Sequence, residues 1–246
     1  MIKMKECEIF SNIKIPCGSK IVVRIDGRNF TKLSRELKLK KPFDENFTNL
    51  MVETCKDFFK EFNPCFIYTF SDEMNILLSD IPFGGRIEKL NSVFASFMAG
   101  SFTNKALNKG NSIERPISFD SRILPLSVSL VLEYFKERQD EAWRNCINGY
   151  AYWTLRKDYS KKEAVYMLKN KKSSSLHEIL FKRGINLADL PAWQRRGIGI
   201  YKKKVLINGY NPIEDINVKS MRKKIFINSN LPIFDEKFFN EILELK

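Results

Sequence analysis

Two apolar segments that each meet an acidic residue at a break constrain this chain more than any other feature. Residues 21–25 form a β-branched run that predicts a buried strand, and Asp26-Gly27 marks the point where it stops. Residues 66–70 and 74–78 predict two strands, with Ser71-Asp72-Glu73 at the bend between them. If the first strand is a neighbour of this hairpin, the acidic residues lie at the same end of one sheet.

Carboxylates crowded at one end of a sheet repel one another, and a bound divalent cation usually relieves that repulsion. Oxygen ligands of this kind suit Mg²⁺. An ordinary explanation also exists, because Asp-Gly often follows a strand as a turn, and Asp-Glu often forms a solvated hairpin tip. The spacing alone leaves both interpretations open.

Composition excludes several classes of protein. The 246 residues are 43% hydrophobic and include 20 Phe, which is ample for a buried core. No apolar run approaches the roughly 20 residues that span a bilayer, and the N-terminus has no signal-peptide core, so we expect a cytoplasmic protein without a membrane segment. The five cysteines lack a Cys-x-x-Cys pair and indicate reduced thiols, and the single His177 excludes a multi-histidine metal centre.

The net charge of +13 is unevenly distributed. Residues 156–204 hold 14 basic and four acidic residues, a net charge of +10. A basic segment beside an acidic cluster indicates a polyanion held next to a metal site. Solvated helix faces in a lysine-rich protein would give the same count, so charge alone does not decide.

The order of predicted elements indicates an α+β fold. Asp44 can cap a helix over 45–62, a second helix covers 86–106, and residues 117–126 predict a further strand. With the strands above, the order is β-α-β-β-α-β, the split ferredoxin-like pattern that polymerase palm domains use. We therefore predict a palm-like catalytic domain over residues 1–155 and a basic C-terminal α/β region over 156–246.

The remaining segments predict one loop and several further helices and strands. Residues 28–43 carry six basic side chains with little helical periodicity, which predicts a loop able to clasp phosphates. A long helix over 127–157 places Arg138 and Asn145 on one face, as site residues or as surface polar residues. The expected elements beyond it are helices at 161–170 and 174–183, a strand at 198–207 followed by a turn at Asn208-Gly209, a strand at 223–228 and a helix at 235–245.

Several short motifs occur in an order that resembles the tRNA-histidine guanylyltransferase family and its relatives that repair tRNA. The resemblance covers roughly residues 5–205. The motifs are Arg-Ile-Asp-Gly-Arg-Asn-Phe (24–30), Lys41-Pro42-Phe43-Asp44, Ser71-Asp72-Glu73, Arg86-x-x-Lys89, Phe119-Asp120-x-Arg122, Arg138-Gln139, His177-Glu178-Ile179-Leu180-Phe181 and Arg196-Gly197.

The resemblance implies a nucleotidyltransferase that extends the 5′ end of tRNA, opposite in direction to ordinary polymerases. ATP would activate the 5′-monophosphate, and the 3′-hydroxyl of GTP or another nucleoside triphosphate would then attack it. Two Mg²⁺ ions would serve both steps. Asp26 and Asp72, the catalytic carboxylates, would bind these ions together with the Gly27 carbonyl. Glu73 would be a further ligand or an outer-shell support.

Other residues take roles by the same resemblance. The residues expected to bind the triphosphate are Gly27, Arg28, Asn29, Phe30, Thr31, Ser71, Arg86 and Lys89, with Lys41 and Asp44 serving the activation step. Weaker candidates for contacts to RNA are Arg138, Asn145, Lys161, Lys162, Arg195 and Arg196. The family resemblance also implies a homotetramer.

Three positions depart from the pattern of the eukaryotic members. Thr31 and Trp143 stand where those proteins have histidine, and Arg196 replaces a lysine. These changes resemble archaeal and bacterial members, so template-dependent repair of tRNA 5′ ends is expected alongside addition of one guanosine to tRNA-histidine. A palm-type nucleotide cyclase and a non-catalytic RNA-binding protein remain alternatives, although the basic segment disfavours the first and the acidic cluster the second.

Overall fold

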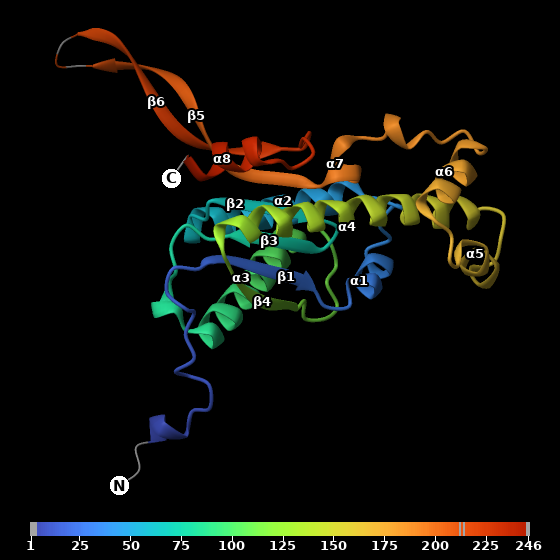
Figure 1. Ribbon diagram of the computed structural model, residues 1–246, viewed down its shortest axis with the longest axis horizontal. Coiled ribbons are helices and arrows are strands. Elements are labelled where there is room, and N and C mark those ends of the chain that lie inside the picture. Colours follow the sequence, from blue (N-terminus) through green and yellow to red (C-terminus); the bar gives the residue numbers. More distant parts are fainter. Residues whose placement is uncertain (1–3, 212, 214, 245–246) are drawn as a thin grey trace.

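An antiparallel sheet organises the protein (Figure 1). The computed structural model describes residues 4–211, 213 and 215–244. Within them the strands lie in the order β4-β1-β3-β2-β5-β6. Their bounds are β1 (Lys20–Gly27), β2 (Phe66–Phe70), β3 (Glu73–Leu77), β4 (Phe119–Leu126), β5 (Ile198–Asn211) and β6 (Ile216–Asn228).

The first four strands and two helices confirm the predicted β-α-β-β-α-β arrangement. Helix α2 (Glu45–Phe62) connects β1 to β2, and α3 (Ile87–Asn108) connects β3 to β4. Asp44 caps α2 as expected, because its Oδ1 accepts a hydrogen bond of 2.9 Å from the amide of Phe47. The strand order 4-1-3-2 is the ferredoxin-like one, so the α+β palm-like fold predicted from the sequence is correct.

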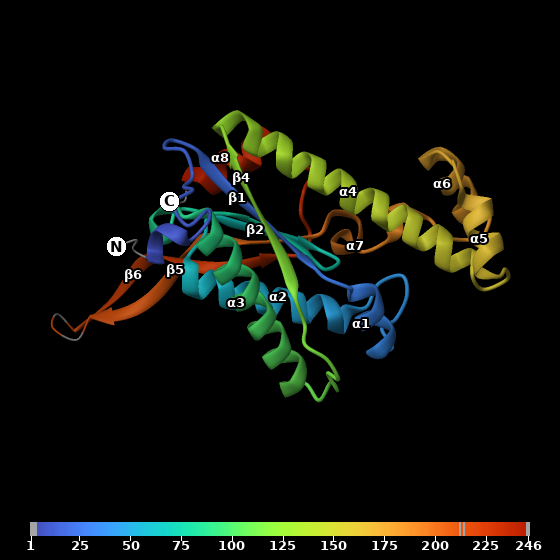
Figure 2. The ribbon, with the colours of Figure 1, turned by 90° about the horizontal axis from the view of Figure 1, so that it is seen from below.

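Helices cover both faces of the sheet. Helices α2 and α3 pack against the face that carries Val23, Ile25 and Ile76. Helices α4 (Val128–Leu155) and α8 (Glu236–Glu244) pack against the other face, which carries Val22 and Phe66. Figure 2 shows α4 and α8 on one side of the sheet and α2 and α3 on the other. Two aromatic-rich cores therefore hold the strands from both sides.

The loop predicted over residues 28–43 is partly wrong, because it contains helix α1 (Phe30–Glu36). Phe30 and Leu33 are buried and anchor this short helix to the core under the sheet. Two apolar positions three residues apart are too few to produce a recognisable helical period in the sequence.

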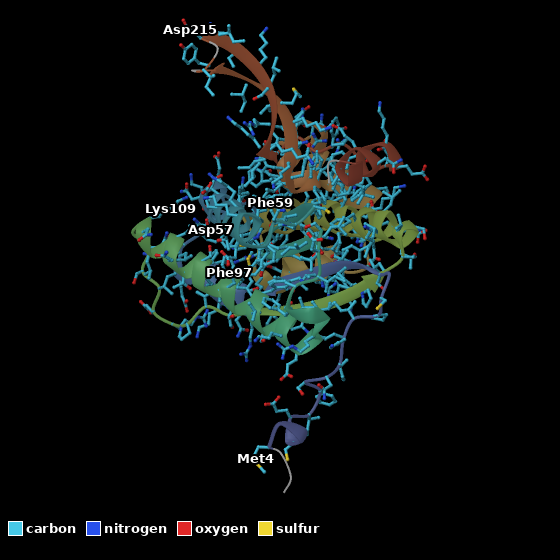
Figure 3. The ribbon with its side chains drawn as sticks, turned by 90° about the vertical axis from the view of Figure 1, so that its left-hand side faces the viewer. Met4, Asp57, Phe59, Phe97, Lys109 and Asp215 are labelled. Carbon is cyan, nitrogen blue, oxygen red and sulfur yellow. The ribbon has the colours of Figure 1, made fainter. Side chains whose placement is uncertain are left out.

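The turn predicted at Asn208-Gly209 is also wrong. Both residues pair within the ladder, opposite Lys219 and Val218, and β5 continues to Asn211. Strand β6 correspondingly begins at Ile216 rather than at residue 223. The result is a two-stranded ribbon that leaves the body of the protein, and Figure 3 shows Asp215 at its outer end.

The other elements are small. They are η1 (Met4–Cys7), η2 (Phe83–Gly85), η3 (Leu187–Asp189), α5 (Lys161–Leu168), α6 (Ser173–Phe181) and α7 (Ala192–Arg196). Helices α5 and α6 lie at the far end of α4 (Figure 1). None of the five cysteines, all of which lie in the described part of the chain, forms a disulfide bond. No helix in the described part of the chain is long and apolar enough to cross a membrane.

The predicted division at residue 155 stays a prediction. Helix α4 ends at Leu155, and the segment after it supplies β5 and β6 to the same sheet, with Ile198–Tyr201 of β5 paired to β2.

Gly197, between α7 and β5, allows a prediction about stability. Its φ is +71°, and a Cβ there would lie 2.6 Å from the ring of buried Tyr68 and 2.8 Å from the Thr69 carbonyl. Gly184 has a similar φ of +76° with nothing within 4 Å. We expect Gly184→Ala to cost about 1 kcal/mol of unfolding free energy through backbone strain, and Gly197→Ala about 3 kcal/mol or more through added overlap. Urea denaturation measures both, and equal losses would contradict the packing argument.

Candidate active site

Three carboxylates form a row across neighbouring strands at one end of the sheet. Asp26 of β1 lies directly opposite Glu73 of β3 and directly opposite Asp120 of β4. Because alternate residues of a strand share a face, this row lies on the α4 face with Val22. The sequence analysis expected Asp26 and the Asp72-Glu73 pair to meet here, and their strands do bring them together.

The two outer carboxylates of the row have cationic partners. Arg122 lies 3.1 Å from Asp120, and Arg138 of α4 lies 3.5 Å from Glu73. Asn75 also donates a 2.9 Å hydrogen bond to Glu73, and Tyr134 donates one of 2.5 Å to Asn75. Glu73 is therefore held on the α4 side by a network of its own.

Asp26 and Asp72 differ, because neither forms a salt bridge with any described residue. Burial raises the pKa of Asp72 to about 6, Ser71 opposes this by donating a 2.9 Å hydrogen bond, and the charge of Asp26 raises the pKa further. Burial and then Asp120 raise the pKa of Asp26. The Gly27 amide also bonds the Asp72 carbonyl at 3.2 Å, which ties the strand end to the hairpin. Arg122 and Arg24 lower the pKa of Asp26 by their charges, but neither carboxyl of this pair has an ion-pair partner among the described residues.

The chemistry of this pair fits Mg²⁺. Among the residues the structure describes, no three His, Cys, Asp or Glu side chains gather closely enough to hold a metal by themselves. Mg²⁺ commonly binds to one or two carboxylates and completes its shell with water and substrate phosphates, which two half-buried carboxylates permit. A closed structural zinc site would need four ligands and does not fit.

Gly27 must be small because of its neighbour in α1. A Cβ at this position would lie 2.4–2.7 Å from the ring of Phe30, which is buried against Phe102 and Phe119. The amides of Gly27 and Arg28 are already used, by the carbonyls of Asp72 and Ser118. Of the amides expected to contact a triphosphate, those of residues 29–31 therefore remain.

A pocket of about 320 Å³ opens beside Asp72. It is large enough for a small ligand. Polar and aromatic side chains from α1, the loop before α2, the hairpin, α4 and α7 form its wall. The residues that matter below are Thr31, Ser34, Lys40, Lys41, Phe43, Asp44, Ser71, Asp72, Asn145, Trp153, Trp193 and Gln194.

Lys41 and Asp44 shape one side of this pocket. The Lys41 ammonium donates to Ser34 at 2.9 Å and lies 5.8 Å from the Trp153 ring centroid. Burial lowers the pKa of Lys41, and Asp44 partly opposes that effect. Both Asp44 oxygens accept backbone hydrogen bonds, from the amides of Phe47 and Lys40. Asp44 thus holds the loop that presents Lys41.

Arg86 and Lys89 do not join this site within their own chain. Arg86 lies beside the strand ends opposite to the carboxylates, where Lys14 pairs with it and α3 begins. Strand β1 separates the two ends by about 20 Å. The family resemblance assigned these residues to the triphosphate, but β3 runs away from the site before the chain reaches them.

The six weaker candidates for contacts to RNA divide into three groups. Asn145 lines the pocket and Arg138 pairs with Glu73, so the shared helical face was correctly predicted. Arg195 and Arg196 donate to the carbonyls of Leu190 and Leu231 and hold loops in place. The side chains that remain exposed are those of Lys161 and Lys162 on α5.

Sequence reasoning missed Asp120 as a member of the carboxylate row and Gln194, Trp153 and Trp193 as pocket residues. The position of Asp120 at the start of a predicted strand was the available signal, but its alignment with Asp26 depends on strand register. Nothing local in the sequence marks the pocket residues of α7.

Comparisons of the sequence with known proteins identify its family. The family model of tRNAHis guanylyltransferase matches residues 1–127, which is more than half of the chain. The probable tRNA(His) guanylyltransferase of Dictyostelium discoideum is 31% identical over 90% of this chain and 88% of its own length. The chain belongs to the tRNAHis guanylyltransferase family, a family of nucleotidyltransferases.

Other relatives extend the comparison. tRNA(His) guanylyltransferase 1 of Arabidopsis thaliana is 30% identical over 97% of this chain, which spans only 43% of that relative's length. A bacterial tRNA(His) guanylyltransferase-like protein in complex with ATP superposes with a TM-score of 0.78 at 25% identity, over 99% of this chain and 98% of its own. One in complex with GTP gives 0.71 at 26% identity, over 98% and 95%.

The uncompensated charge at Asp72 predicts an unusual effect on stability. The folded-state pKa of about 6 lies above the ordinary 3.8, so the stability that this carboxyl contributes is present below pH 4 and lost as the pH rises through 6. We expect Asp72→Asn to stabilise the metal-free protein at pH 8 by roughly 1–3 kcal/mol, with no gain at pH 4. Added Mg²⁺ should stabilise the parent protein and not the variant.

Thermal unfolding in EDTA and in Mg²⁺ measures these differences. Asp80→Asn makes the same chemical change at an exposed position and serves as the control. A loss of stability in Asp72→Asn at pH 8, or equal stabilisation of both proteins by Mg²⁺, would contradict the assignment.

Proposed function

We propose that this chain adds nucleotides to the 5′ end of tRNA in the 3′–5′ direction. The observation that carries the proposal is the Asp26–Asp72 pair, which has no ion-pair partner among the described residues and lies beside a pocket of about 320 Å³, in a chain of this family. The ATP and GTP complexes of bacterial relatives support nucleoside triphosphates as substrates. The names of the curated relatives support tRNA as the acceptor.

The proposed reaction has two displacements at phosphorus. An oxygen of the tRNA 5′-monophosphate attacks the α-phosphorus of ATP, and pyrophosphate leaves. The 3′-hydroxyl of GTP or another nucleoside triphosphate then attacks the 5′-phosphorus of the adenylylated tRNA, loses its proton and displaces AMP. Mg²⁺, when bound, neutralises the charge that develops on the attacking and leaving oxygens.

The residues of the site have different proposed roles in this reaction. Asp26 and Asp72 would hold two Mg²⁺ ions, with the Gly27 carbonyl as a further ligand. Glu73 supports them from outside, because Arg138 and Asn75 already occupy its oxygens. Lys41, presented by the loop that Asp44 holds, supplies positive charge to the phosphates of the activating ATP.

Further phosphate contacts are proposed for Ser71, for exposed Arg28, and for the amides of Asn29, Phe30 and Thr31. Arg86 and Lys89 lie too far from this pocket to act in their own chain. The homotetramer implied by the family resemblance would allow them to act in the site of another copy.

The β5–β6 ribbon, residues 202–224, is the proposed RNA contact outside the pocket. It carries seven basic and two acidic residues. Lys203 lies directly opposite Lys224 on the paired strands, an arrangement of like charges that disfavours the free ribbon. A phosphate backbone would relieve this repulsion. The exposed Lys161 and Lys162 of α5 lie at the opposite end of the molecule (Figure 1) and would form a separate RNA contact.

An addition assay tests the catalytic proposal. The substrates are ATP, GTP and Mg²⁺ with a 5′-monophosphorylated tRNA that lacks its first nucleotide, and in parallel intact tRNA-histidine. We expect addition, and we expect Asp72→Ala to lower its rate at least about a hundredfold because the transition-state charge loses its stabilisation. If the protein binds the tRNA but adds no nucleotide to it, the catalytic proposal is wrong and the chain is an RNA-binding protein.

The same assay separates the two tRNA reactions. We expect addition to the truncated tRNA that follows the opposing template base, because Thr31 and Trp143 resemble the archaeal and bacterial members. Addition only to tRNA-histidine, whatever base lies opposite, would assign strict guanosine addition instead.

The ribbon predicts a change in the salt dependence of tRNA binding. In the double variant Lys203→Gln/Lys224→Gln we expect weaker binding and a log–log slope shallower by about 0.7–0.9 for each lost phosphate contact. The stability of the free protein should change little, because the lost like-charge pair offsets the lost contact of the Lys203 ammonium with the Phe226 ring, 5.2 Å from its centroid. Lys60→Gln/Lys136→Gln makes the same charge change at exposed sites elsewhere. An equal change of slope in both double variants would remove the ribbon from the interface.

A further inference from the structure

The wall of the pocket contains one amide whose orientation is set by a tyrosine. Tyr150 of α4 donates a hydrogen bond of 2.5 Å from its hydroxyl to Oε1 of Gln194 on α7, and Gln194 lines the pocket. A glutamine amide has one acceptor oxygen and one NH₂ donor group. Since Tyr150 occupies the oxygen, the group left for a ligand is the donor.

This amide lies at the aromatic end of the pocket. Asp72, Ser71 and Ala142 line the end near the carboxylates, and Tyr150 follows Ala142 by eight residues, about 12 Å along α4. Phe43 packs next to Gln194, with ring centroids 5.9 Å from Tyr150 and 5.8 Å from Trp193. A nucleotide with its phosphates at Asp72 would place its base among these rings.

We propose that Gln194 is a specificity-determining residue that donates a hydrogen bond to an acceptor atom on the base of the activating ATP. Tyr150 is its positioning residue and acts only through it. The inference rests on the proposed function, which assigns the pocket to that nucleotide.

The physical reason for the pair is the symmetry of an amide. The side-chain amide of an unconstrained glutamine rotates about its last bond and offers either its oxygen or its NH₂ group. It can therefore pair with a base edge that donates or with one that accepts a hydrogen bond. Once Tyr150 holds the oxygen, a base must present an acceptor or leave a polar group unpaired at the pocket wall. Discrimination by an unmade hydrogen bond is stronger than discrimination by shape in an apolar pocket. The phosphates and ribose are common to all nucleotides and carry no such information.

Nucleotide binding tests the inference directly. Trp153 and Trp193 line the pocket, so their fluorescence can report the Kd. The probes are ATP, ATP analogues that each lack one ring-nitrogen acceptor, and inorganic tripolyphosphate, which has no base. The variants are Gln194→Met, which is neutral and similar in length, Tyr150→Phe, and Asn148→Leu as a control on the exposed side of α4.

We expect Gln194→Met to weaken ATP about tenfold and Tyr150→Phe about threefold, with tripolyphosphate changed less than twofold. One deaza analogue should bind the parent protein as weakly as ATP binds Gln194→Met, and Gln194→Met should no longer distinguish that analogue from ATP. The control should match the parent protein. Unchanged ATP binding in Gln194→Met, or an equal loss of ATP and tripolyphosphate, would overturn the inference.

Activity separates this inference from the proposed function. Gln194→Met should slow ATP-dependent addition to 5′-monophosphorylated tRNA. It should not slow addition to 5′-triphosphorylated tRNA, in which the 3′-hydroxyl displaces pyrophosphate and no activating ATP is needed. If the parent protein shows the binding pattern but transfers no nucleotide to tRNA, the proposed function fails and the base contact stands. If the parent protein binds no ATP, the assignment of the pocket to ATP is wrong, and the proposed base contact is wrong with it.

Discussion

The repulsion between Asp26 and Asp72 is the interaction on which the site depends. Folding supplies arginine partners to the flanking carboxylates Asp120 and Glu73 and none to this pair. Burial raises the pKa of both carboxyls, and the charge of Asp120 raises that of Asp26 while the charge of Asp26 raises that of Asp72. Ionisation of these groups therefore lowers the stability of the metal-free protein. Aromatic cores on both faces of the sheet keep the strands in place despite this cost. The folded site therefore persists without a metal ion, and binding of a cation would relieve the repulsion between its carboxylates.

Local patterns in the sequence were enough to predict the frame of this site. Strand β1, the β2–β3 hairpin and helices α2, α3 and α4 begin and end within two residues of their expected bounds, because their periodicity and the Asp44 cap act over a few residues. The meeting of Asp26 with the hairpin needed only one further assumption, that the two strands are neighbours.

The missing parts depend on contacts that no local pattern contains. Asp120 joins the row through strand register, which the packing of the whole strand determines. Tyr150 and Gln194 lie 44 residues apart in the chain and meet only because α7 packs on α4. The family resemblance assigned Arg86 and Lys89 to the triphosphate, and β3 carries the chain to the other end of the sheet before it reaches them, so that role stays a prediction.

Helix α4 connects the separate parts of the site. Its 28 residues extend about 42 Å as one element. Along it lie Arg138 at the carboxylate network, Asn145 in the pocket and Tyr150 at the pocket's aromatic end, and the basic helices α5 and α6 lie at its far end. Because a helix is stiff, the distances between these groups are set by residue number alone. An insertion of one residue between Arg138 and Asn145 would rotate every later group by about 100°. It would turn Asn145 and Tyr150 away from the pocket while Arg138 stays at the carboxylate network.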